Sequence, residues 1–177
     1  MKFLITCLLL SLSMYYLCSP TDRNHPDGWS ECARIENEVI RETLNSYPGI
    51  YVTATGGGSL LGVERLSLHL KTEKSLSIRE IRKIVIGTAN RFLHALDSSK
   101  EIRPYLVEYP FPVREITIFI NIYPQAGDNP TSKGRLSNGM FYVEVEDTKL
   151  AKETFKEANQ ILEKEALDEI DNKWEEK

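Results

Sequence analysis

Residues with reactive side chains are few in this chain and widely spaced. It contains three cysteines and three histidines: Cys7, Cys18, Cys32, His25, His69 and His94. They form no Cys-x-x-Cys pair and no cluster with the ligand spacing of a zinc site. The Gly-x-Ser-x-Gly turn that exposes a nucleophilic serine in many hydrolases is also missing. The sequence therefore favours a protein that is not an enzyme, and it predicts no catalytic residue, no metal and no cofactor.

A glycine-rich stretch at 56–62 has the composition of a phosphate-binding loop. Such a loop needs a helix after it and usually a Gly-Lys-Ser/Thr sequence to reach phosphate and metal. No such lysine follows here, and residues 66–71 alternate between apolar and polar like a strand. We therefore predict a hairpin turn in which the glycines supply positive φ angles.

Cys18 is the residue whose surroundings suggest a covalent modification. Residues 1–18 begin with Lys2 and continue without another charge, and residues 19–28 are polar and read as a flexible linker. A basic start, an apolar middle and a polar exit are typical of an export signal. If this is a bacterial lipoprotein signal, Cys18 is acylated and the lipid attaches the protein to a membrane.

Two other interpretations of residues 1–18 remain open. A cleaved secretory signal needs small residues before the cut, which Ser11 and Ser13 supply. A membrane-spanning helix needs about 20 apolar residues, more than the roughly sixteen found here. Acylation and cleavage both predict an exported protein, in the cell envelope (periplasmic or lipid-anchored) or outside the cell. A disulfide between Cys18 and Cys32 could form in an oxidising compartment unless Cys18 is acylated.

A proline- and aromatic-rich segment at 103–112 is the strongest candidate for a binding surface. Its prolines restrict the backbone, so that Tyr105, Tyr109 and Phe111 could present their rings to a protein or peptide partner at little cost in entropy. The alternative is that these rings seal the edge of the sheet against a helix.

The charge distribution argues against nucleic acid as a partner. The chain carries a net charge of −4, whereas nucleic-acid binding requires a basic face. Locally, residues 147–177 have an excess of acids and residues 79–135 an excess of bases. The simplest explanation of both is ordinary solvated faces.

The periodicity of apolar residues predicts the first half of the fold. Apolar residues recur at helical spacing over 29–46, and β-prone or alternating residues at 50–55 and 66–71 indicate two strands of a hairpin. Ser77 and Glu80 have the spacing of a capping box, which predicts a helix over 78–97.

The second half is predicted to contain two strands and one helix. Isoleucines alternate over 116–123, which is typical of a central strand, and residues 141–146 alternate in the same way. Residues 124–138 are predicted to form a long polar loop. Asp147 is the predicted N-cap of the last helix.

Together these elements predict an α+β fold with the order α-ββ-α-ββ-α. Strands that follow one another through short turns favour an antiparallel sheet, here of about four strands, with the helices packed on one face. The predicted organisation is a single α+β domain at 29–166, followed by an acidic helical tail at 167–177.

Part of the chain resembles a known group of proteins. The motifs Arg103-Pro104-Tyr105-Leu106 and Tyr109-Pro110-Phe111, followed by the isoleucine-rich strand, are similar to a pattern in uncharacterised exported proteins of chlamydia-type and other host-associated bacteria. The resemblance covers residues 85–123. It implies export but no particular chemistry, and no functional residue is carried over from it.

The function that these observations favour is an exported, non-catalytic domain that binds a protein or peptide partner in the cell envelope or outside the cell. Two alternatives stay open. One is a small exported hydrolase with a site built across the sheet. The other, which rests on the resemblance, is a secreted effector directed at a host.

Overall fold

The computed structural model describes residues 28–58, 62–124, 130–145 and 148–175, with side chains up to Leu167. The predicted export signal at 1–18, including Cys18, lies outside the described residues. So does the predicted linker at 19–28, apart from Gly28.

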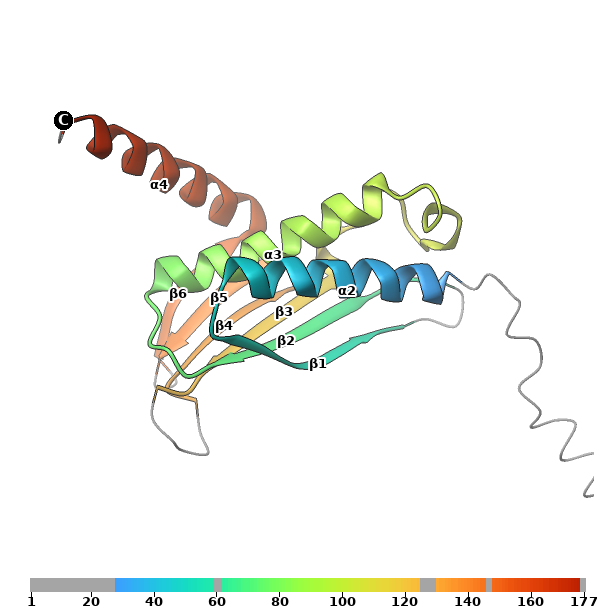
Figure 1. The fold of residues 1–177 in the computed structure, drawn as a ribbon, viewed down its shortest axis with the longest axis horizontal. Helices are drawn as coiled ribbons and strands as arrows, with labels where there is room; N and C mark the ends of the chain where they lie inside the picture. Colours follow the sequence, from blue (N-terminus) through green and yellow to red (C-terminus); the bar gives the residue numbers. More distant parts are fainter. Residues whose placement is uncertain (1–27, 59–61, 125–129, 146–147, 176–177) are drawn as a thin grey trace, which may run out of the picture.

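The described residues form two layers, a six-stranded sheet and three helices (Figure 1). The α+β class is confirmed, and α2 and α3 lie side by side over one face of the sheet. The elements follow the order α-ββ-α-ββββ-α: α2 (Trp29–Ser46), β1 (Ile50–Gly57), β2 (Leu66–Thr72), α3 (Ile78–Ser98), β3 (Ile116–Ile122), β4 (Ser132–Ser137), β5 (Met140–Val145), β6 (Thr148–Thr154) and α4 (Phe155–Glu175).

The strands lie in the sheet in the order in which they occur in the chain, from β1 to β6. The prediction of an antiparallel sheet of about four strands is wrong, because the sheet has six strands and one parallel pair. β2 and β3 pair in parallel, because α3 crosses over the sheet and returns the chain to the end where β2 began. The other neighbouring strands are antiparallel.

The two strands that were not predicted have weak apolar patterns. β4 lies within the predicted loop at 124–138, and its buried positions are only Gly134 and Leu136. Gly134 allows α3 to approach the sheet, since a Cβ at this position would lie 2.2 Å from Cγ2 of Ile81. β6 forms an edge of the sheet, and most of its side chains are exposed.

The start of α3 is confirmed as predicted, with a complete capping box. The amide of Glu80 donates to Oγ of Ser77 at 3.2 Å, and the amide of Ser77 donates to Oε2 of Glu80 at 2.8 Å. The buried stripe of α3 then packs on β3, β4 and β5. A strong cap and a continuous apolar stripe explain why this helix was predictable.

The start of α4 differs from the prediction. The helix begins at Phe155 rather than after Asp147, because Thr154 and Glu157 form a second capping box. The amide of Glu157 donates to Oγ1 of Thr154 at 3.2 Å, and the amide of Thr154 donates to Oε2 of Glu157 at 2.7 Å. In the described part of the chain, no helix combines the length and apolar character that a membrane crossing requires.

The glycines after β1 also differ from expectation. Gly56 and Gly57 extend the strand, and among the described glycines of 56–62 the one with a positive φ angle is Gly62. A side chain at Gly57 would collide with the backbone, since its Cβ would lie 2.5 Å from the carbonyl oxygen of Arg65. The glycines therefore allow two chain segments to approach closely.

Candidate binding surface

The segment 103–112 does not expose three aromatic rings. Phe111 is only 3% exposed and belongs to the hydrophobic core, and its amide donates to Oδ1 of Asp97 at 2.9 Å. The expectation that this ring faces a partner must therefore be corrected. The sequence of a short proline-flanked segment suggests an exposed loop. This segment instead contacts the end of α3, and its Phe111 ring packs into the core.

The other two rings of this segment have different surroundings. Tyr105 is partly buried against the start of α2, where a Cβ on Gly28 would lie 2.4 Å from Cβ of Tyr105. Tyr109 is 47% exposed, and its ring lies 4.3 Å from the guanidinium carbon of Arg103. The segment thus offers one exposed ring, which is a small target for a partner.

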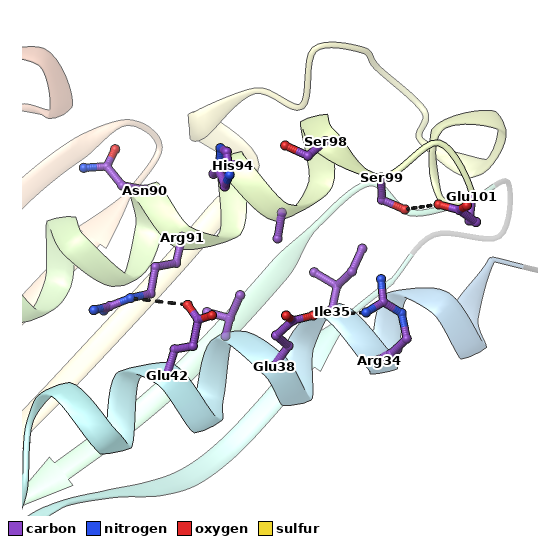
Figure 2. Close-up of a pocket in the computed structure, with 12 residues that line it drawn as sticks. Arg34, Ile35, Glu38, Glu42, Asn90, Arg91, His94, Ser98, Ser99 and Glu101 are labelled. Carbon is purple, nitrogen blue, oxygen red and sulfur yellow. Dashed lines mark hydrogen bonds and ion pairs between the residues drawn. The ribbon is translucent and has the colours of Figure 1, made fainter.

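A larger groove lies between α2 and α3 (Figure 2). It has a volume of about 730 Å³, and charged side chains of both helices line it. Figure 2 shows that they point toward one another: Arg34 pairs with Glu38 at 3.0 Å, and Arg91 pairs with Glu42 at 3.7 Å.

The two arginines of this groove make further polar contacts within the protein. Arg34 also pairs with Glu31 at 2.7 Å, and Nη2 of Arg91 donates to Oγ of Ser46 at 2.8 Å, although Nη1 is buried without an acceptor. Because its charges are mainly compensated by one another, we interpret the groove as the seam along which α2 and α3 pack.

The opposite face of the sheet is covered by no described helix or strand (Figure 1). Side chains alternate between the two faces of a strand. In β3, for example, the isoleucines are buried under the helices, whereas Thr117, Phe119 and Asn121 are half-buried on the other side. We call this second side the open face. Its rings are Tyr51, His69, Phe119 and Tyr142, its cations are Lys71, Lys133, Arg135, Lys149 and Lys152, and Glu144 also lies on it.

The strand register places three rings and two cations of the open face in one row. His69, Phe119, Arg135, Tyr142 and Lys152 are direct neighbours from β2 to β6. The ring centroids of His69 and Phe119 are 4.7 Å apart. The row therefore forms a continuous band across five strands.

The cations of the open face lie over its rings. The guanidinium carbon of Arg135 is 4.9 Å from the ring centroid of Tyr142 and 5.9 Å from that of Phe119. Nζ of Lys149 is 4.2 Å from the ring of Tyr142. At these distances the rings attract the cations and hold them in place without neutralising their charge.

The open face is electropositive on a chain that is acidic as a whole. Five Lys and Arg side chains of the six strands lie on it, against one carboxylate, whereas the whole chain has a net charge of −4. Among the described residues, no carboxylate forms an ion pair with Lys71, Arg135, Lys149 or Lys152. Unlike the groove between α2 and α3, the open face carries charges that its own side chains do not compensate.

A hollow of about 280 Å³ lies in the middle of the open face. It is lined by His69, Phe119, Asn121, Lys133, Arg135, Tyr142 and Glu144. In the part of the chain that the structure describes, no three His, Cys, Asp or Glu side chains are grouped closely enough to hold a metal ion. The chemistry available at this surface is therefore electrostatic attraction, hydrogen bonding and stacking.

The sequence contained part of the signal for this surface. His69, Phe119 and Tyr142 occupy the polar-side positions of predicted strands, where large rings are unusual if the face is simply solvated. Lys133 and Arg135 could not be placed, because β4 was predicted as a loop.

No family model, no curated protein and no solved structure matches this chain. Its function is therefore inferred from the geometry and charge of the open face.

Proposed function

We propose that this protein is an exported, non-catalytic binding domain that holds an acidic segment of a protein or peptide on the open face of its sheet. The observation that carries the proposal is the uncompensated positive charge of this face, where cations lie over aromatic rings on an otherwise acidic chain. Surfaces of one charge sign attract and orient partners of the opposite sign.

The dimensions of the face suit a short extended segment. Its cations extend from Lys71 on β2 to Lys152 on β6, which is four strand spacings, or about 19 Å. An extended peptide advances about 3.3 Å per residue, so about six residues would cross the charged band. The rings of Phe119 and Tyr142 add apolar contact area at low entropic cost.

Charge also argues against two other occupants. A second copy that docked face to face would bring five Lys and Arg side chains against five others, which is repulsive. A nucleic acid is a long polyanion that extends beyond the face, and there the net charge of −4 on the chain opposes it. A short acidic segment can lie entirely within the basic area.

The export of the protein is part of the proposal and rests on residues 1–18. Their basic start, apolar run and polar exit support export, with Cys18 as the candidate lipid attachment point. The intact mass of the protein purified from native membranes distinguishes the routes. A chain that starts at Ser19 or Met14 without lipid indicates secretion, and an acylated Cys18 indicates a lipoprotein. An uncleaved, unmodified chain would contradict both.

Binding is tested by fluorescence anisotropy with labelled hexaglutamate, hexalysine and a short single-stranded DNA at physiological salt. We expect the purified protein to bind hexaglutamate only. The double charge reversal Lys71→Glu/Lys152→Glu should abolish binding, whereas Lys83→Glu/Lys100→Glu, which makes the same change on exposed residues away from the sheet, should have little effect. Preference for DNA, or equal losses in both variants, would overturn the proposal.

A further inference from the structure

Arg135 is the side chain of the open face with the most unused hydrogen-bonding capacity. A guanidinium has five N–H donors in a rigid planar fork. The guanidinium of Arg135 lies over the rings of Phe119 and Tyr142, but it makes no hydrogen bond or ion pair with any described residue. The two rings thus position the guanidinium, and its N–H donors remain available for a ligand.

The positive charge of Arg135 is not balanced by its neighbours in the hollow. Its partners in the strand register are Phe119 on β3 and Tyr142 on β5, which are both uncharged. Lys133, the other cation of the hollow, stands directly opposite Glu144, so that its charge is offset. An anion that enters the hollow is therefore attracted mainly by Arg135.

The size of the hollow limits what it can take. Its volume of about 280 Å³ lies just below the range of whole small-molecule sites, which begins near 300 Å³. It also lies at the centre of the charged band. These dimensions fit one side chain of a longer ligand.

We infer that the hollow is a subsite for one oxyanion-bearing side chain of the partner, a carboxylate or a phosphate group, which Arg135 holds through two parallel hydrogen bonds. The inference rests on the proposed function, because it assumes that an acidic segment crosses the open face. Guanidinium groups match the planar, two-oxygen geometry of these anions, whereas an ammonium group acts as a point charge. His69 and Asn121 also line the hollow and could donate to the same anion.

The test compares Arg135→Lys, which keeps the charge but loses the fork, with Lys152→Gln, which removes a charge from the edge of the same face. We expect Arg135→Lys to weaken binding of hexaglutamate about tenfold, as the loss of a charge-assisted hydrogen-bond pair should. Lys152→Gln should weaken it only about twofold. Thermal unfolding of both variants checks that the fold is intact.

The outcomes separate this inference from the proposed function. If Arg135→Lys binds as the wild type does while Lys152→Gln loses affinity, the face acts through diffuse charge, and the subsite is overturned although the binding domain stands. If the wild type does not bind hexaglutamate, the proposed function itself fails. Replacing a central glutamate of the peptide with phosphoserine or phosphotyrosine identifies the anion: tighter binding that depends on Arg135 indicates phosphate, and no gain indicates carboxylate.

Discussion

Arg82 of α3 and Glu153 of β6 form a bidentate ion pair that joins the helix layer to the edge of the sheet. Nε of Arg82 donates to Oε2 of Glu153 at 2.9 Å, and Nη2 donates to Oε1 at 2.7 Å. The side chains are 9% and 16% exposed. Nη1 of Arg82 also reaches Glu165 of α4 at 3.4 Å, so one side chain connects α3, β6 and α4.

Removing one partner of this pair should destabilise the protein strongly. Glu153→Ala leaves a mostly buried guanidinium whose remaining ion pair among the described residues is the longer contact to Glu165. A broken buried pair typically costs about 3 kcal/mol or more. Glu38→Ala is the matched control, because it breaks the exposed pair with Arg34 and should cost less than about 1 kcal/mol. Urea unfolding measures both changes, and equal small losses would show that the Arg82 pair contributes little.

Phe111 and Tyr109 should respond in opposite ways to truncation, although they are two residues apart. Phe111→Ala removes a core ring and should lower the free energy of unfolding by about 3–5 kcal/mol. Tyr109→Ala removes an exposed ring and should change it by less than about 1 kcal/mol. Thermal and urea unfolding of the two variants test this, and a stable Phe111→Ala protein would mean that the ring is not part of the core.

Gly134 should be intolerant of even one added methyl group. A Cβ at this position would lie 2.2 Å from Cγ2 of Ile81 and 3.0 Å from Cγ2 of Ile120. Gly134→Ala should therefore force α3 away from β4 and cost about 1–3 kcal/mol. In Gly58→Ala, by contrast, the added methyl group meets no atom of the other described residues within 4 Å. Comparable stability of the two variants in urea would contradict close packing of α3 on the sheet.

The elements that the sequence predicted well are those in which local signals agree. The helix that begins at Ile78 has both a capping box and an apolar stripe, and β3 alternates four isoleucines with other residues. β4 and β6 lack such patterns. The helix-facing positions of β4 include Gly134, and those of β6 include Glu153, whose charge is balanced by a residue distant in sequence. A local sequence pattern cannot indicate an ion pair between residues that are distant in sequence.

The binding surface was predictable in part for the same reason. The alternating patterns of β3 and β5 place Phe119 and Tyr142 on the side of each strand that faces away from the core. Both residues become neighbours of Arg135 only because β4 lies between these strands. The parallel pairing of β2 and β3 follows from α3, since a helix between two adjacent strands is typical of a crossover connection. Phe111 was misplaced because proline-rich segments look exposed until their tertiary contacts are known.

The two capping boxes should make the protein less stable in mild acid. Hydrogen bonds from the backbone amides of Ser77 and Thr154 lower the pKa of Glu80 and Glu157 from their usual value of 4.5. A carboxyl group whose pKa is lower in the folded state contributes stability above its unfolded pKa, and that contribution is lost as the pH falls through the folded value. Stability should therefore decrease as the pH falls below about 4.5.

The variant Glu80→Gln/Glu157→Gln tests this directly, because glutamine can still accept the capping hydrogen bonds but does not titrate. Urea unfolding at several pH values between 6 and 3 should show a smaller loss of stability in the variant than in the wild type. Glu73→Gln, a change at an exposed carboxylate outside both caps, should leave the wild-type pH dependence in place. If the double variant and the wild type have parallel pH profiles, the caps do not carry the acid sensitivity.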